Sequence, residues 1–250
     1  MRPEAVIFDL DGTLTDNMPL HRKSFDRFLA ARGLPPLSEQ LRHRLDGKRN
    51  RDIFPVLLGR ELGEEELRAF GEEKESLYRE LSRGHLRPLD GLLGLLDFLQ
   101  AEGLPVALAT SAPAPNIPHT LGELGLAARF PVVVRSDEVP RGKPWPDVFL
   151  EAARRLGRAT RRCLAFEDSP AGVEAAAAAG MNVVAITTTF PPRVFEKQGR
   201  ASGAFPEFRS WWRAQGRRLF QSGAPEPTGK PDRGPDPEGP HPRGATTSEG

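Results

Sequence analysis

Two aspartates, Asp9 and Asp11, stand at the end of the first apolar run of the chain, with Gly12 directly after them. Alternate residues of an extended strand point to the same side, so both carboxylates are presented together at the end of that strand. Two close carboxylates repel each other unless a cation joins them, and hard divalent cations prefer carboxylate oxygens. The pair therefore predicts a divalent-metal site, although the pattern alone also fits a solvated strand end.

Three further segments carry polar residues next to apolar runs. Thr110 and Ser111 end the second core run, where a hydroxyl and free backbone donors can lie beside a phosphate. Lys143 precedes a helical pattern and can offer a point charge to phosphate oxygens. Glu167 and Asp168 end a later run and add ligands for a hard cation. Each feature alone is also typical of a turn or an ordinary surface.

These residues must be positioned by the elements before them, and short apolar runs alternate with helical patterns along most of the chain. The runs are nearly all apolar, which is typical of strands buried on both faces of a parallel sheet. We expect strands at 5–8, 106–109, 132–134, 163–166 and 183–186. We expect helices at 92–100, 116–124, 148–156 and 171–179, the last with Ser169 as its N-cap. The alternation predicts an α/β fold with a doubly wound, Rossmann-like parallel sheet.

Residues 18–86 break this alternation. They contain helical patterns and no convincing strand, and Pro and Gly at both edges are typical of hinges. The expected helices are 22–31, 38–45 and 64–81. A helical insertion after the first strand can close over the carboxyl ends of the strands, where such sheets bind ligands. We therefore expect an α/β core at 1–17 and 87–220 with an inserted all-helical cap domain at 18–86.

Charge and cysteine content restrict the possible partners. Lys and Arg number 35 against 34 Asp and Glu, so no overall field attracts nucleic acid or an anionic membrane. Cys163 is the only cysteine, which excludes an internal disulfide and a thiolate metal site, and its apolar neighbours indicate a buried strand residue. The sequence shows neither a leader pattern nor a long apolar stretch. We expect a cytoplasmic monomer without nucleic-acid or membrane partners.

The C-terminal part of the chain has two different compositions. Residues 221–250 combine Pro, Gly and mixed charges with almost no apolar side chain, so we expect disorder. Residues 205–220 combine Phe and Trp with Arg. One interpretation is a nucleic-acid platform of stacking aromatics and basic side chains. The favoured interpretation is a terminal helix that packs its aromatic face on the domain, because stacking modules need several platforms and a basic surface.

Four segments of the chain, taken in order, resemble the four motifs of haloacid dehalogenase-like phosphotransferases. They are DLDGTLTD at 9–16, TS at 110–111, GKPWPD at 142–147 and FEDSPAGV at 166–173. With the glycine and methionine at 180–181, the fourth is similar to the branch of β-phosphoglucomutases and sugar phosphatases with a helical cap. Four ordered matches are far more specific than any one of them.

The resemblance implies magnesium-dependent phosphoryl transfer. Asp9 would attack phosphorus and form an aspartyl-phosphate, and Asp11 would protonate the leaving oxygen and then accept a proton from water. The ligands of Mg²⁺ would be the Asp9 carboxylate, the Asp11 backbone carbonyl and the Asp168 carboxylate. Glu167 would not bind the ion itself but would support the residues that do.

The resemblance also implies sites for the phosphoryl group and for the rest of the substrate. Thr110, Ser111 and Lys143 would hold the phosphoryl group, whose spread charge needs fixed donors and cations. The family places its substrate-specificity loop near a basic segment of this cap. The expected substrate-contacting residues of the cap are His21, Gly47, Lys48, Arg49 and Asn50. A histidine at the first of these positions occurs in mutases and phosphatases alike, so it does not discriminate.

Three functions remain open at this point. The first is a phosphatase that acts on a small phosphorylated metabolite, a sugar phosphate in particular. The second is a β-phosphoglucomutase, but mutases carry Lys-Gly and an Arg three residues on, where this chain has Asp46-Gly47 and Asn50. Asp46 would also repel a distal phosphate, so hydrolysis is favoured. The third is a non-catalytic binding module that uses residues 205–220, against which the intact acidic set argues.

Overall fold

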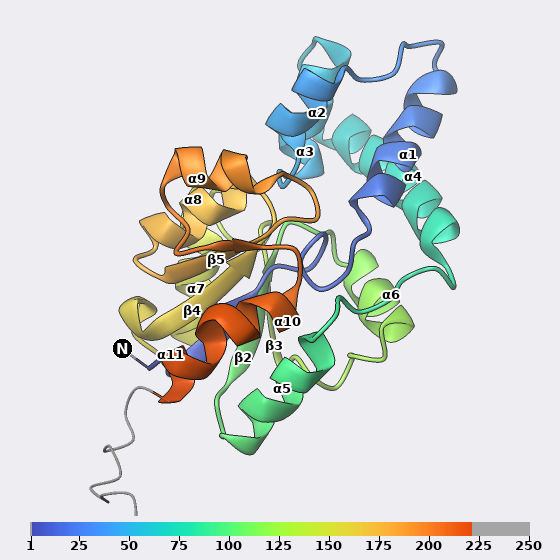
Figure 1. The fold of residues 1–250 in the computed structure, drawn as a ribbon. Helices are drawn as coiled ribbons and strands as arrows, with labels where there is room; N and C mark the ends of the chain where they lie inside the picture. Colours follow the sequence, from blue (N-terminus) through green and yellow to red (C-terminus); the bar gives the residue numbers. More distant parts are fainter. Residues whose placement is uncertain (1, 222–250) are drawn as a thin grey trace, which may run out of the picture.

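A six-stranded parallel sheet forms the centre of the computed structural model, which describes residues 2–221. The strands are β1 (Ala5–Phe8), β2 (Val106–Thr110), β3 (Val132–Arg135), β4 (Cys163–Glu167), β5 (Asn182–Ile186) and β6 (Ala204–Phe205). Their order is β3-β2-β1-β4-β5-β6 (Figure 1). The chain therefore winds outward from β1 to β3 and then returns to β4 on the other side of β1. This doubly wound order places a ligand-binding crevice between β1 and β4.

The five expected strands are confirmed, and each agrees with the predicted bounds to within one residue. The sixth strand was not predicted, because β6 has only two residues and sits at the sheet edge beside β5. Cys163 begins β4 and is buried, as its apolar neighbours indicated.

Helices cover both faces of the sheet, and the alternation of side chains along β1 shows why. Val6 and Phe8 pack on one face against α5, α6 and α10, whereas Ala5 and Ile7 pack on the other against α7 and α8. The core helices are α5 (Leu92–Ala101), α6 (Asn116–Glu123), α7 (Asp147–Arg155), α8 (Pro170–Ala178), α9 (Pro192–Gln198), α10 (Phe208–Trp211) and α11 (Arg217–Gln221). The short α9 was not predicted. Ser169 caps α8, since its hydroxyl accepts a hydrogen bond from the backbone N–H of Gly172 at 3.0 Å.

The aromatic segment 205–220 belongs to the core. Phe208 and Trp211 are fully buried, and both rings contact Phe166 of β4 with centroid distances of 5.0 and 4.7 Å. Phe220 of α11 is buried in the same cluster. Packing on the domain is therefore confirmed, and these rings are not available as stacking platforms for nucleic acid.

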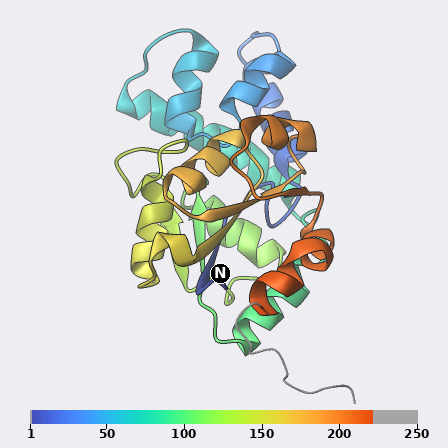
Figure 2. The same ribbon diagram turned by 60° about the vertical axis from the view of Figure 1, so that its left-hand side comes forward.

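Four helices between β1 and α5 form the inserted cap, which lies beyond one end of the sheet in both ribbon views (Figure 1 and Figure 2). They are α1 (Met18–Ala30), α2 (Glu39–Leu45), α3 (Asn50–Leu58) and α4 (Glu64–Ser82). The cap has a small core of its own around Phe28 and Phe54. The expected start of the first helix at residue 22 was wrong, because Pro19 fits the first turn of α1 instead of ending a hinge. Helix α3 was not predicted, because the sequence there was interpreted as a basic loop.

Two further expectations concern the C-terminal segment and membrane-spanning helices. The segment 221–250, expected to be disordered, lies outside the described residues except for Gln221, which ends α11. Within the described part of the chain, no helix combines the length and the apolar character that a bilayer crossing requires.

Candidate active site

The strand register brings the predicted motifs to one edge of the sheet. Phe8 of β1 is paired with Phe166 of β4, so the residues that follow them, Asp9 and Glu167, lie level with each other. Lys143 reaches this edge from the loop before α7. Its ammonium lies 2.5 Å from Asp9 Oδ1 and 2.6 Å from Glu167 Oε1, and all three side chains are buried.

The burial of this triad sets its electrostatics. Burial raises the pKa of Asp9, and the nearby Lys143 ammonium opposes that rise. Burial alone would lower the pKa of Lys143, but the carboxylates of Asp9 and Glu167 outweigh it and raise that pKa. Lys143 is therefore a permanent cation that favours the ionised, nucleophilic form of Asp9.

Glu167 is held mainly by protein donors. Its Oε2 accepts hydrogen bonds from the Ser169 backbone N–H at 2.8 Å and from the Ser169 hydroxyl at 3.0 Å. A Cβ at Gly172 would come within 1.7 Å of Glu167 Oε1, so only glycine leaves room for this carboxylate above the start of α8. With its oxygens engaged in this way, Glu167 orients Lys143 and Ser169.

One cluster of acids could hold a metal ion. Asp9, Glu167 and Asp168 are buried and each offers a carboxylate oxygen, with the three oxygens within 4.8 Å of one another. Burial, followed by the charges of Glu167 and Asp9, raises the pKa of Asp168. A divalent cation would relieve this crowding, and oxygen ligands suit Mg²⁺, so the donor set fits the expected metal. The Thr189 hydroxyl also donates a hydrogen bond to Asp168.

The turn after β1 requires a glycine beside Asp168. Gly12 has a φ of +80°, and a Cβ there would come within 2.0 Å of Asp168 Oδ2. The glycine of the first motif thus lets the turn after β1 approach the acid that follows β4.

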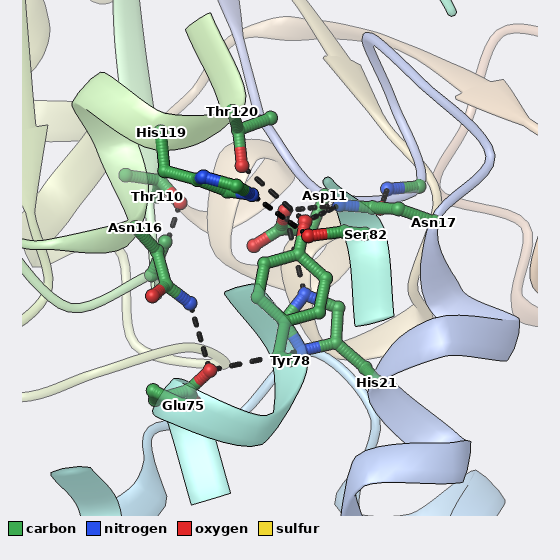
Figure 3. Close-up of polar contacts among 12 residues, drawn as sticks. Asp11, Asn17, His21, Glu75, Tyr78, Ser82, Thr110, Asn116, His119 and Thr120 are labelled. Atoms are coloured by element: carbon green, nitrogen blue, oxygen red, sulfur yellow. Dashed lines mark hydrogen bonds and ion pairs between the residues drawn. The ribbon is translucent and has the colours of Figure 1, made fainter. Parts of the chain in front are cut away.

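Asp11 lies beside the cap and is held by two side chains (Figure 3). Asn17 Nδ2 donates to Asp11 Oδ1 at 2.6 Å, and His21 Nε2 lies 3.5 Å from the same oxygen. Burial would raise the pKa of Asp11, but His21 and Asn17 outweigh it and lower that pKa. The Lys74 ammonium lies 2.9 Å from His21 Nδ1 and can only donate, so in a neutral His21 the proton is on Nε2, the nitrogen on the side of Asp11.

The two hydroxyls at the end of β2, on Thr110 and Ser111, have partners inside the protein. Thr110 Oγ1 accepts a hydrogen bond from the Ala112 backbone N–H at 3.0 Å, and Ser111 Oγ donates to the Gly47 carbonyl of the cap at 2.9 Å. Both residues line the pocket described next. Their role in phosphate binding stays a prediction, and Ser111 would have to exchange the Gly47 carbonyl for a phosphate oxygen.

A pocket that opens to solvent lies between the acids of the core and the cap. His21, Gly47, Lys48 and Asn50 line it, and their expected contact with the substrate stays a prediction. Gly47 has a φ of +84° and touches the start of α8, where a Cβ would come within 2.4 Å of Ser169 Oγ.

Arg49 is not among the residues that line this pocket, and its expected contact with the substrate stays a prediction. Its guanidinium binds both oxygens of Asp52, at 2.7 and 3.1 Å, and the Ser136 carbonyl at 3.2 Å. The reason is local: Arg49 is the N-cap of α3, and Asp52 in the first turn is the nearest acid. Arg51 likewise pairs with Glu64 at 2.6 Å. Among the described residues, none forms a hydrogen bond or ion pair with the Lys48 ammonium.

Several residues at the site were missed from the sequence. Lys74 and Glu75 of α4 are buried, contact each other at 2.9 Å and line the pocket. They lie on the buried face of α4 with Tyr78. Charged residues on the face of a helix that packs inward were therefore the sequence signal that could have identified them. Arg22 of α1 also lines the pocket and pairs with Asp46 at 3.0 Å, a contact between distant residues that spacing could not predict.

Comparison with known proteins gives consistent matches. A sequence model of the haloacid dehalogenase-like hydrolase family matches residues 3–180. A phosphorylated carbohydrates phosphatase from Thermotoga maritima is 36% identical over 182 residues, which cover 71% of this chain and 82% of that protein. The β-phosphoglucomutase of Bacillus subtilis is 33% identical over 193 residues, covering 73% and 83%. A solved hydrolase of family IA, variant 3, from Entamoeba histolytica has a TM-score of 0.77 at 27% identity and covers 87% of this chain and 97% of its own.

Proposed function

Because the chain belongs to the haloacid dehalogenase-like hydrolase family, we propose that it is a Mg²⁺-dependent phosphatase that hydrolyses a sugar phosphate through an aspartyl-phosphate on Asp9. The family makes it a phosphoric monoester hydrolase. The observation that carries the finer proposal is the buried contact of 2.5 Å between Asp9 and Lys143 at the switch point of the sheet.

The first half of the reaction would transfer the phosphoryl group to the enzyme. An Asp9 oxygen forms a bond to phosphorus while the bond from phosphorus to the sugar oxygen breaks. Asp11 gives that leaving oxygen a proton. The lowered pKa of Asp11 opposes this step, but the negative charge of a bound substrate phosphate would raise it again. Lys143 offsets the charge that spreads over the phosphoryl oxygens.

The second half would release phosphate. A water molecule attacks phosphorus and passes a proton to the Asp11 carboxylate, which the first half of the reaction leaves ionised, and the bond to Asp9 breaks. Asp9 and Asp168, together with the backbone carbonyl of Asp11, would hold Mg²⁺. When bound, the ion would offset negative charge on the phosphoryl group and fix its orientation.

The substrate class follows from the pocket and from the relatives. The pocket is lined by Lys48, Asn50, Arg22 and Glu75, which are hydrogen-bonding groups suited to sugar hydroxyls. The Thermotoga maritima relative is a phosphatase of phosphorylated carbohydrates. We therefore propose a sugar phosphate, with residues 18–86 as the cap that selects it.

Phosphate release from a panel of sugar phosphates and from p-nitrophenyl phosphate tests this function. Turnover should require MgCl₂ and stop with EDTA, and a rapid acid quench should leave a phosphoryl group on the peptide that contains Asp9. No turnover of any phosphomonoester, or turnover unaffected by EDTA, would contradict the proposal.

A β-phosphoglucomutase is the second candidate, and one observation favours it more than the sequence did. Asp46, expected to repel a distal phosphate, is paired with Arg22 at 3.0 Å, and burial raises its pKa. The expected repulsion is therefore weakened. Incubation with Mg²⁺, β-glucose 1-phosphate and a trace of β-glucose 1,6-bisphosphate separates the two activities. Glucose 6-phosphate formed much faster than free phosphate would replace the hydrolase with the mutase.

A further inference from the structure

Helix α4 of the cap meets helix α6 of the core through buried polar contacts (Figure 3). Tyr78 Oη lies 3.3 Å from Thr120 Oγ1, and Ser82 Oγ lies 2.8 Å from His119 Nε2. Asn116 Nδ2 donates to Glu75 Oε2 at 2.7 Å. Polar groups at such a boundary lose their partners when the helices separate, so these contacts define one relative position of cap and core.

One contact extends from this boundary to Asp11. Asn17 Nδ2 donates to Asp11 Oδ1 and to Tyr78 Oη, at 2.6 Å in each case. The backbone N–H of Gly12 donates to Asn17 Oδ1 at 2.9 Å. Because a backbone N–H can only donate, this bond identifies the amide oxygen of Asn17, so the two protons on Nδ2 go to Asp11 and Tyr78.

The direction of the next hydrogen bond follows. The Tyr78 hydroxyl accepts from Asn17, so its own proton is free to go to Thr120 Oγ1 on the core helix. Asn17, Tyr78 and Thr120 are fully buried. Loss of either hydrogen bond that joins them therefore leaves an unsatisfied polar group.

We propose that Tyr78 is a positioning residue, which makes the placement of the Asp11 carboxylate depend on contact between α4 and α6. When α4 rests on α6, the Tyr78 hydroxyl holds the Asn17 amide in the orientation that fixes Asp11. When the two helices part, Asn17 loses that acceptor and Asp11 loses an oriented donor. The inference rests on the proposed function, in which Asp11 transfers the proton.

The ring and the hydroxyl of Tyr78 can be tested apart. The ring stacks on His21 with a centroid distance of 3.7 Å and an interplanar angle of 9°. Tyr78→Phe keeps this stack and removes only the hydroxyl. Ser82→Ala is the matched control, because it removes another contact between α4 and α6 that does not reach Asn17 or Asp11.

The readout is the dependence on the leaving group. An alkyl phosphate such as a sugar phosphate needs a proton on its leaving oxygen, whereas p-nitrophenol departs without one. The parameter kcat/KM covers steps only through phosphoryl transfer to the enzyme, so it isolates the acid role of Asp11. Tyr78→Phe should lower the ratio of kcat/KM for the alkyl phosphate to that for p-nitrophenyl phosphate by at least about tenfold. Ser82→Ala should leave the ratio within about twofold.

Two further sets of variants make the outcome decisive. Thr120→Val should lower the ratio in the same direction and Thr120→Ser should restore it, which covers the case that Tyr78→Phe fails to fold. Asp11→Asn is the reference: if it does not lower the ratio, the proton-transfer role in the proposed function is wrong. If it lowers the ratio but Tyr78→Phe and Thr120→Val do not, or if Ser82→Ala has the same effect, the positioning role is overturned.

Discussion

The two ends of the pocket are built in different ways. At the core end, Lys143 is fixed between Asp9 and Glu167 by contacts of 2.5 and 2.6 Å, and all three side chains project from the sheet edge or the loop beside it. At the cap end, Arg22 pairs with Asp46 across two helices, and Lys48 has no ion-pair partner within residues 2–221.

The two ends of the pocket therefore differ in what a substitution there should change. The core groups are placed by strand register, which tolerates little change, and Lys143 offsets part of the negative charge of Asp9 and Glu167 before a substrate arrives. The cap groups are side chains on helices or on the connection between α2 and α3, and their positions depend on pairwise contacts that one substitution can alter. Substitutions at the core end should therefore remove turnover for every substrate, whereas substitutions at the cap end should change preference among substrates.

The largest effect is expected for Asp9→Asn at the core end. It removes the proposed nucleophile without a change in volume, so turnover of p-nitrophenyl phosphate should fall on the order of a thousandfold or more. Lys143 keeps Glu167 as a partner, so the melting temperature should stay within a few degrees. Turnover retained at a tenth or more of the wild-type rate would show that another group is the nucleophile.

Lys143→Ala should affect both turnover and stability. It leaves the buried carboxylates of Asp9 and Glu167 without a cation, which should cost about 3–5 kcal/mol in the free energy of unfolding. Loss of the phosphate-facing charge should lower turnover about a hundredfold. Urea denaturation without Mg²⁺ measures the first effect.

The double variant Lys143→Ala with Glu167→Gln separates these two effects. Removing one negative charge should recover part of the stability but none of the turnover. Recovery of both would mean that Lys143 serves the fold alone.

Asp168→Asn should weaken Mg²⁺ binding on the order of a hundredfold, because it removes one charged member of the acidic cluster. The rise in melting temperature with added Mg²⁺ reports affinity without turnover. Glu174→Gln on α8 is the control, since that acid pairs with Arg200 on the surface. An unchanged Mg²⁺ response in Asp168→Asn would exclude this residue as a ligand.

The sequence predicts the core of the fold well because each strand is a buried apolar run whose bounds follow from composition. Phe8, for example, ends both an apolar run and β1, which places Asp9 at the sheet edge without further information. Helix α3 and strand β6 were not predicted from the sequence, for physical reasons. Arg49 and Asn50 give no periodic signal at the start of α3, and two residues of β6 are too few for a pattern.

The residues of the site likewise include some that the sequence predicts and some that it does not. Asp9, Lys143 and Asp168 lie in motifs that follow strands, so the register of the sheet assembles them. The residues behind the two partners of Asp11 could not be predicted. Lys74 contacts His21 and Tyr78 contacts Asn17, and both come from a helix more than fifty residues away from Asp11 in sequence. Their positions depend on how the cap rests on the core, which is a property of tertiary packing alone.

The smallest effect is expected at the cap end, for Lys48→Ala. Lys48 lines the pocket with an ammonium that none of the described residues engages, so it is free to contact a substrate hydroxyl or phosphate. Its removal should raise KM for the preferred sugar phosphate about fivefold, on the order of 1 kcal/mol, with kcat nearly unchanged. The KM for p-nitrophenyl phosphate, which lacks the sugar, should change less.

Arg51→Ala is the matched control for this prediction. Arg51 carries the same charge three residues away, but it pairs with Glu64 at 2.6 Å and does not line the pocket. If the effect of Lys48 is a direct contact, it should persist in about 0.5 M salt, where the field of an exposed charge is screened over a few ångströms, and Arg51→Ala should leave KM within about twofold. Equal changes in both variants, abolished by salt, would show long-range attraction of the substrate instead. The cap end would then lack the specific contact that the comparison with the core end assigns to it.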